Sequence, residues 1–176
     1  TINAAQASCY IDRTILSSDD PDIIAVADAH GCEAPFVRQN VLANDTAASI
    51  DVVLDALERV PGYDIVVLLQ PTSPFRSKDD IDGTIALLQS APSAVSATPA
   101  VTHPWLVYRP DPSGLLTSYV NTPVGGFRRQ DLPPALTLNG AVYAADVIWL
   151  RQERAFVSAG QTRVWTMPVE RSLDID

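Results

Sequence analysis

The last residues of the chain have the types and spacing of a metal-binding pair. Asp174 and Asp176 are two positions apart in the closing segment Arg171-Ser-Leu-Asp-Ile-Asp176. Side chains two apart in an extended segment project to the same side, so the two carboxylates would lie together. Carboxylates that share a cation with substrate phosphate oxygens suit Mg²⁺, which prefers hard oxygen ligands and keeps several waters. A polar chain end at a helix cap is the alternative interpretation of the same residues.

A second group of polar residues follows an apolar run. Ile65–Leu69 is apolar without alternation, which is typical of a strand covered on both faces in a parallel sheet. It leads into Gln70-Pro71-Thr72-Ser73-Pro74. Ligands of open α/β sheets bind beyond the carboxyl ends of the strands, and Gln70, Thr72 and Ser73 offer short donors and acceptors there. A stiff turn whose hydroxyls cap the backbone explains the same letters, and spacing alone does not choose between the two.

The elements that would position these residues alternate along most of the chain. Strands are expected at 13–17, 34–37, 65–69, 94–98, 141–145 and 164–167. Helices are expected after the start signals Asp20-Pro21, Asn44-Asp45-Thr46 and Ser77. The apolar faces of these helices are predicted from the residues Ile23, Ile24, Val26 and Ala27, then Ile50, Val53, Leu54 and Leu57, then Ile81, Ile85 and Leu88.

Such alternation predicts right-handed βαβ units and an α/β fold of three layers, α/β/α and Rossmann-like, with a mostly parallel sheet. The segment Thr102–Pro134 breaks the rhythm because it is rich in proline, glycine and aromatic residues. Segments of this length are usually lids or interface arms. With 176 residues, a single domain 1–176 is expected, with 102–134 as an arm within it.

Composition excludes several classes of protein. A net charge of −9 argues against nucleic-acid binding, which needs a basic surface. No apolar run approaches the roughly 20 residues of a membrane helix, and the first ten residues lack the features of a signal peptide, so a soluble cytoplasmic protein is expected. Cys9 and Cys32 have no metal-binding spacing. Lys78 is the only lysine beside eleven arginines, which suits bidentate anion recognition or reflects a GC-rich genome.

Six segments in order resemble a known family. Leu69-Gln-Pro-Thr-Ser-Pro-Phe-Arg76 is similar to the LQPTSPLR motif of the N-acylneuraminate (CMP-sialic acid) cytidylyltransferases. The other five are Phe36–Arg38 with Leu42–Ser49 (LRP…LA-D-TASS), His103-Pro104 (HHP), Arg128–Pro133 (RQxLP), Asn139–Tyr143 (NGAIY) and Arg171–Asp176 (SxDID). No single motif is specific, but six in the same order over almost the whole chain are.

The resemblance implies a nucleotide-diphospho-sugar-transferase-like fold and transfer of CMP from CTP to a sialic-type nonulosonic acid. It implies catalytic roles for Gln70, Arg129, Asp174 and Asp176, with Mg²⁺ held by the two aspartates. Arg129 would hold the sugar carboxylate through its bidentate fork. By the same resemblance, the residues that bind substrate are Arg38 and Ser49 at the nucleotide and Gln70, Thr72, Ser73, Arg129, Asn139 and Tyr143 at or near the sugar.

The resemblance also implies a homodimer, in which the arm packs on a second subunit and contributes to its sugar site. For Tyr143 alone, core packing is the commoner role of such a residue. His103 matches a family histidine, and a structural role is expected for it. A cytidylyltransferase for the eight-carbon acid KDO is a nearby alternative that the Gln-Pro-Thr-Ser-Pro and Asp-Ile-Asp patterns fit less well.

One family feature has no counterpart in residues 1–176. Family members begin with a strand and an ARxGSKG-type loop that holds the triphosphate through backbone amides and basic side chains, whereas Thr1-Ile-Asn-Ala-Ala resembles the helix that follows that loop. A sheet without its first strand should expose apolar surface on its neighbours. The chain is then part of a longer enzyme, a truncated product, or a degenerate member that binds nucleotide or sugar or pairs with an active homologue.

Overall fold

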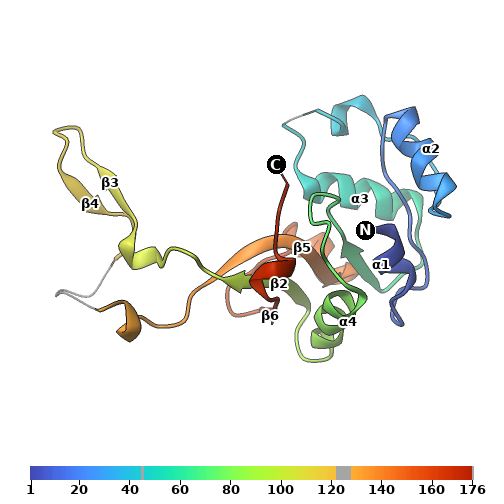
Figure 1. The fold of residues 1–176 in the computed structure, drawn as a ribbon. Coiled ribbons are helices and arrows are strands. Elements are labelled where there is room, and N and C mark those ends of the chain that lie inside the picture. Colours follow the sequence, from blue (N-terminus) through green and yellow to red (C-terminus); the bar gives the residue numbers. More distant parts are fainter. Residues whose placement is uncertain (45, 122–127, 176) are drawn as a thin grey trace.

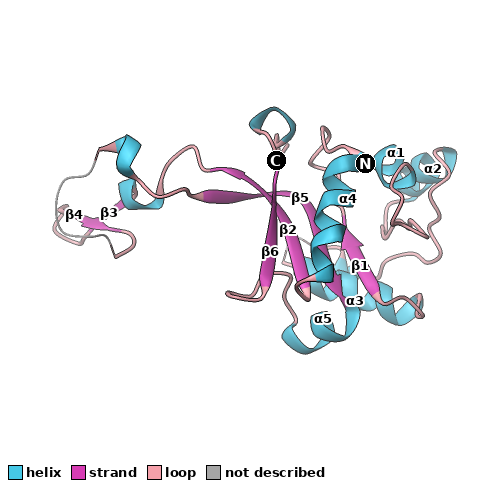
Figure 2. Ribbon diagram, turned by 90° about the horizontal axis from the view of Figure 1, so that it is seen from below, coloured by secondary structure: helices cyan, strands magenta, loops and turns pink. Residues whose placement is uncertain are grey.

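The computed structural model describes residues 1–44, 46–121 and 128–175, apart from the side chain of Arg129. The helices are α1 (Ile2–Gln6), α2 (Pro21–Ala29), α3 (Ser49–Arg59), α4 (Lys78–Ala86) and α5 (Val147–Glu153). The strands are β1 (Ile65–Leu68), β2 (Ser93–Pro99), β3 (Tyr108–Pro110), β4 (Leu116–Ser118), β5 (Leu136–Asp146) and β6 (Thr162–Thr166). Short 3₁₀ turns are η1 (Asn40–Leu42), η2 (Leu87–Gln89), η3 (Pro104–Leu106), η4 (Arg129–Asp131) and η5 (Val169–Arg171). Helices cover both faces of the central sheet (Figures 1 and 2).

The central sheet has the strand order β1-β5-β2-β6. β2 and β6 are parallel, while β5 is antiparallel to both β1 and β2. Three of the four strands therefore run in the same direction, and the predicted mostly parallel α/β fold is confirmed. Because β5 runs the opposite way, its beginning lies at the carboxyl end of β1, where Gln70 follows.

The long strand β5 separates two hydrophobic clusters. Its side chains alternate between the two faces of the sheet. Tyr143 and Ala145 face the cluster formed with α3 and α5, whereas Val142 and Ala144 face the cluster formed with α4. The core residues are Val53, Leu54, Leu57, Val147, Leu150 and Phe156 on the first side and Ile81, Ile85 and Met167 on the second.

Two of the predicted helix starts are confirmed by their caps. The Asp20 carboxylate accepts the N–H groups of Asp22 and Ile23, and Pro21 is the first residue of α2. Ser77 and Asp80 form a reciprocal capping box at α4. The third start was placed too early: α3 begins at Ser49, since Asn44 turns the chain by accepting the N–H of Thr46, and Asp45 lies outside the described residues.

Two predicted strands, 13–17 and 34–37, are wrong. Each contributes only single bridges, Ile15 with Glu33 and Ser18 with Val37, because neither segment continues beside a full-length neighbour. Strand-like composition alone does not make a strand without a pairing partner.

The predicted burial of Ile23 and Val26 is also wrong, since their exposed fractions are 52% and 60%. The helix α2 packs through Ala27, which is buried. Ile23 and Val26 instead line a cavity of about 980 Å³ that also reaches β1, α3 and the loop before α2. Among the described residues, no strand pairs with the outer edge of β1. Ile65, at this edge, is 44% exposed.

The arm leaves the body of the molecule between β2 and β5 (Figure 1). It carries the hairpin β3–β4, whose turn is closed by the Asp111 carboxylate, an acceptor for the N–H groups of Ser113 and Leu115. His103 has a structural role at its base, since its two ring nitrogens contact the Trp105 N–H and the Pro133 carbonyl. Several large apolar side chains of the hairpin are exposed: Tyr108, Leu115, Leu116 and Tyr119.

Candidate active site

Three of the predicted site residues converge around Gly140, at the carboxyl end of β1. A Cβ atom added to Gly140 would lie 2.7 Å from Gln70 Oε1, 3.5 Å from Asp174 Oδ2 and 3.8 Å from Ser73 Oγ. Gly140 has φ +70°, a conformation that residues with a side chain rarely adopt. The glycine therefore leaves the space into which the loop after β1 and the closing segment bring their polar groups.

Buried Arg76 supports the backbone of this loop. Its guanidinium donates to the carbonyl of Gln70 at 3.1 Å, to Thr1 Oγ1 at 2.7 Å and to the carbonyl of Ala141. Burial lowers the pKa of Arg76 to about 10, and the charge of Asp80 opposes that shift. Arg76 thus links Ala141 of β5 and Thr1 to the backbone of Gln70.

Asn139 is an internal tie as well as a neighbour of the site. Its side chain is 5% exposed. The Asn139 amide donates to Ser172 Oγ at 3.0 Å and accepts from Ser96 Oγ at 2.7 Å. Its backbone carbonyl contacts Ser73 Oγ at 3.4 Å. The predicted sugar neighbours Asn139 and Ser73 are both bonded to protein groups, so they shape the wall of the site.

Tyr143 combines core packing with proximity to Asp174. Its ring lies 5.6 Å from that of Phe156 and forms part of the α3–α5 side of the core. Burial raises the pKa of the Tyr143 phenol, and the negative charge of Asp174 raises it further. Both effects favour the neutral form of the phenol.

The closing segment runs beside the loop after β1 (Figure 1). The Ile175 N–H donates to the Thr72 carbonyl at 2.9 Å, which makes Thr72 a backbone partner of the segment. Asp174 itself is exposed. Asp176, the second predicted metal ligand, lies outside the described residues.

The two residues predicted to bind the nucleotide are Arg38 and Ser49. Arg38 lines the cavity beside β1 together with Gln70, and its Nε donates to Ser17 Oγ at 3.1 Å. Ser49 is the first residue of α3 and is exposed. Arg38 and Gln70 therefore share one cavity, whereas Ser49 is not among the residues that line it.

Arg129 is a predicted site residue whose backbone lies apart from the residues around Gly140. It begins η4 in the arm, and Figure 1 shows that part of the arm well away from the sheet. Its neighbour Arg128 forms a bidentate pair with Asp131 at 2.7 and 3.2 Å, so Arg128 is already occupied by a carboxylate.

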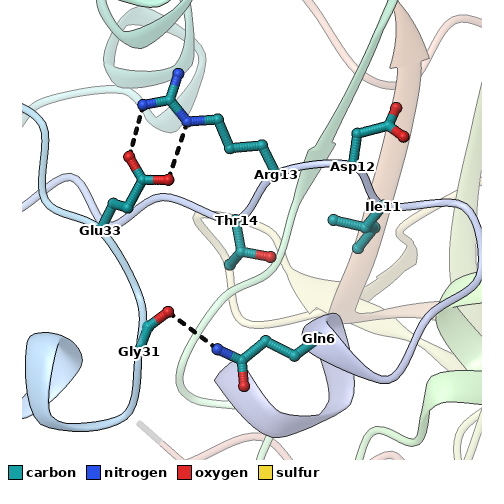
Figure 3. A pocket seen from close by; sticks show the side chains of 7 residues that line it. All are labelled: Gln6, Ile11, Asp12, Arg13, Thr14, Gly31 and Glu33. Atoms are coloured by element: carbon teal, nitrogen blue, oxygen red, sulfur yellow. Dashed lines mark hydrogen bonds and ion pairs between the residues drawn. The ribbon is translucent and has the colours of Figure 1, made fainter.

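A smaller pocket of about 250 Å³ lies elsewhere and has a structural explanation (Figure 3). Arg13 binds the Glu33 carboxylate at 2.7 Å, and the Gln6 amide donates to the carbonyls of His30 and Gly31, both at 3.1 Å. These bonds fasten α1 and the loop before α2 to the segment that follows α2. The pocket contains none of the predicted site residues.

The residues present fit a divalent cation that takes some of its ligands from a substrate. Asp174 offers an exposed, hard oxygen donor near the amide oxygen of Gln70. Within residues 1–44, 46–121 and 128–175, no three His, Cys, Asp or Glu side chains form a ready metal cluster. A site that relies on one or two carboxylates plus phosphate oxygens is the arrangement Mg²⁺ usually takes.

Sequence reasoning missed three residues of this region: Gly140, Arg76 and Asp80. Asp80 is fully buried and binds Arg171, the residue that opens the closing segment. A Ser-x-x-Asp capping signal at Ser77 was visible in the sequence. Nothing in the sequence shows that Asp80 of this cap is buried and bonded to Arg171.

Several relatives of the chain are named as cytidylyltransferases or as a CMP-sugar-acid synthase. It is 30% identical to CMP-N,N'-diacetyllegionaminic acid synthase of Legionella pneumophila, over all of this chain and 78% of that protein. It is 28% identical to N-acylneuraminate cytidylyltransferase of Escherichia coli, over all of this chain and 42% of that protein. Pseudaminic acid cytidylyltransferase of Campylobacter jejuni is 42% identical over 45% of this chain and 36% of that protein. The matched region thus covers less than half the length of two of these three relatives.

Solved structures share the fold. CMP:2-keto-3-deoxy-manno-octonic acid synthetase, solved with CTP, superposes with a TM-score of 0.66 at 15% identity, over 96% of this chain and 77% of that one. The 4-diphosphocytidyl-2C-methyl-D-erythritol synthase of Anaerococcus prevotii gives 0.67 at 15% identity, over 99% and 78%. No described helix is long and apolar enough to cross a membrane. A family model for cytidylyltransferases matches residues 1–130, and we conclude that the chain belongs to this family of nucleotidyltransferase enzymes.

Proposed function

We propose that the protein transfers CMP from CTP to the anomeric hydroxyl of a nine-carbon, sialic-type nonulosonic acid. The hydroxyl releases its proton to solvent and its oxygen bonds to the α-phosphorus. The bond from the α-phosphorus to the oxygen that bridges to the β-phosphate breaks, and pyrophosphate leaves. The observation that carries the proposal is the convergence of Gln70, Ser73 and Asp174 at Gly140. It lies at the carboxyl edge of an α/β sheet, where such folds bind their ligands. The names of the relatives support the substrate class.

The roles follow from position and chemistry. Gln70 would contact the sugar acid through its side-chain amide, whose oxygen faces Gly140. Thr72, Ser73, Asn139 and Tyr143 would shape the sugar pocket. Arg38 would bind the nucleotide from the cavity beside β1, and Ser49 would bind it from the start of α3. The Tyr143 hydroxyl can donate a hydrogen bond. Most of the rate enhancement would then come from positioning and from neutralising charge.

Asp174 and Asp176 would hold Mg²⁺. When bound, the ion offsets the charge that develops on the reacting phosphate oxygens. The exposed carboxylate of Asp174 beside Gln70 supports this assignment. The remaining ligands would be phosphate oxygens and water, as is usual for Mg²⁺.

We further propose that the protein acts as a homodimer in the cytoplasm. The arm 102–134, within a single domain 1–176, would lie on the partner, and Arg129 would reach the sugar carboxylate of the partner's site. Two observations support it: η4 lies far from Gly140 in its own chain, and the arm exposes Leu115, Leu116 and Tyr119 at 67%, 73% and 67%. Exposed apolar groups of this size usually mark an interface.

The test is pyrophosphate release from CTP with a panel of acids: neuraminic, legionaminic and pseudaminic acids and the eight-carbon KDO. It uses the full-length protein that carries residues 1–176, with Mg²⁺ present. Pyrophosphate release with a nine-carbon acid is the expected result. Release with KDO alone would show that the substrate is an eight-carbon acid. Calorimetric binding of CTP or sugar without any pyrophosphate release would favour the alternative of a module that binds nucleotide or sugar without catalysis.

A further inference from the structure

The acidic closing segment is held mainly by polar contacts. Leu173 and Ile175, its two apolar residues, are 49% and 56% exposed, so hydrophobic packing holds them only weakly. Its fixed points are Arg171, Ser172 and the N–H of Ile175. The position of Asp174 between them therefore depends on whether these ties are made.

The strongest of the ties joins Arg171 to Asp80. Arg171 Nε and Nη2 each contact one Asp80 oxygen at 2.9 Å, in bidentate geometry. Asp80 is fully buried, while Arg171 lies at the surface end of the pair with 41% of its side chain exposed. The Asp80 oxygens also accept from Trp165 Nε1 at 3.3 Å and from Ser77 Oγ at 2.7 Å.

A helix cap does not require this arrangement. The capping box needs only the reciprocal bonds between Ser77 and Asp80, and such residues usually remain in contact with water. Here the carboxylate is removed from water, which is costly unless a cation compensates it. Trp165 helps to enclose it, because its indole ring lies flat against Gly83, where an added Cβ would approach the ring to 2.6 Å.

The consequence lies three residues further along the chain. Arg171 ends η5, Ser172 then binds Asn139, and Asp174 follows with Oδ2 next to Gly140. We propose that Arg171 is a positioning residue: by gripping the buried Asp80 carboxylate it sets where Asp174 stands in the site. The inference rests on the proposed function, since it gives Asp174 its task. Arg171 itself touches neither substrate nor metal.

The experiment compares Arg171→Met and Arg171→Lys with wild type and with a matched control, Arg59→Met. The control breaks another arginine–aspartate pair, Arg59 with Asp55 at 2.8 Å on α3. Hydrogen exchange is followed at the Ile175 amide, which bonds to Thr72, and at Val142 in the core. Mn²⁺ binding in the presence of CTP is followed by electron paramagnetic resonance, and kcat and KM for pyrophosphate release are measured.

Arg171→Met is expected to speed exchange at Ile175 about tenfold or more while Val142 stays protected, because only the local tie is lost. Mn²⁺ affinity and kcat should fall by a similar factor, with a smaller change in KM for CTP. Arg171→Lys should recover part of each loss, since lysine keeps the charge but not the bidentate fork. The control should resemble wild type.

Wild-type protection at Ile175 in Arg171→Met would overturn the proposal, and so would a loss spread evenly over the whole core. Should Arg171→Met not fold, Trp165→Phe removes one donor to Asp80 and is read by the same exchange measurement. Failure of the wild-type protein to release pyrophosphate would sink the proposed function. The exchange and Mn²⁺ measurements would still decide the positioning role in that case.

Discussion

At the scale of residues, Gly140 is a position of the site where an added side chain would collide with its neighbours. Substitution by alanine would place a Cβ 2.7 Å from the Gln70 amide oxygen and would also strain a backbone with φ +70°. The amide must move, because contacts that short do not persist. Gly140→Ala should therefore lower kcat/KM for the sugar acid by more than about tenfold, measured by pyrophosphate release.

Gly160→Ala is the matched control for that prediction. Gly160 has φ +78° but no atom within 4 Å of an added Cβ, so it carries the same backbone strain without the collision. Both variants should lose roughly 1 kcal/mol of stability from the backbone alone. Equal activity losses in the two variants would show that strain, and not the displacement of Gln70, is responsible.

Asp174 tests the metal assignment at the same scale. Asp174 is exposed, so Asp174→Asn should leave the free energy of unfolding within about 0.5 kcal/mol of wild type. Turnover should fall by about a hundredfold or more, because an amide is a poor Mg²⁺ ligand. Asp176→Asn should behave alike. Glu170→Gln removes an exposed carboxylate of the preceding turn and should be neutral; equal activity of all three variants would remove Mg²⁺ from the aspartates.

At the scale of elements, the junction of α4, β6 and η5 should respond to acid. Burial raises the pKa of Asp80, but hydrogen bonds from Arg171, Ser77 and Trp165 outweigh it and bring the pKa down to about 2. A carboxylate with a lowered folded-state pKa stabilises the fold above its ordinary pKa near 4 and loses that effect as pH falls toward 2. Wild type should lose about 2 kcal/mol between pH 5 and 2 from this group.

Urea unfolding at stepped pH measures this loss. Asp80→Asn should be less stable at neutral pH and show a flatter pH profile than wild type. Asp79→Asn, which removes the exposed neighbouring carboxylate, should follow the wild-type profile. A profile of Asp80→Asn that runs parallel to wild type would show that another group titrates.

Elements that are specified by local sequence were predictable, whereas those that depend on residues distant in the sequence were not. The cap at Ser77, the apolar face of α3 and the run Ile65–Leu68 are local signals that the fold keeps. The expected strands at 13–17 and 34–37 fail because pairing depends on a neighbour, which composition does not report. Likewise, the loop after β1 and the acidic end were recognisable from their sequence motifs. That both lie beside Gly140 depends on β5 running antiparallel to β1, which the sequence did not predict.

At the scale of the whole molecule, the arm should set the assembly state. Leu116 on β4 is 73% exposed in the isolated chain, and a charge there would be costly in an apolar interface. Leu116→Asp should convert dimer to monomer in sedimentation equilibrium while leaving the unfolding temperature of the body unchanged. Ile148→Asp is the control, since Ile148 on α5 is 70% exposed outside the arm. A wild-type monomer at micromolar concentration would refute the dimer.

The separation of Arg129 from Gly140 leads to the sharpest test of how the site is built. If each site takes Arg129 from one subunit and Asp174 from the other, Arg129→Met and Asp174→Asn should each be inactive alone. When the two variants are mixed in equal amounts and refolded together, half of the dimers should contain one subunit of each variant. Each mixed dimer has one intact site out of two, so about a quarter of wild-type activity should return. A site completed within one chain predicts no return, because one subunit would lack its arginine and the other its carboxylate. Pyrophosphate release by the mixture, against each variant refolded alone, decides between the two.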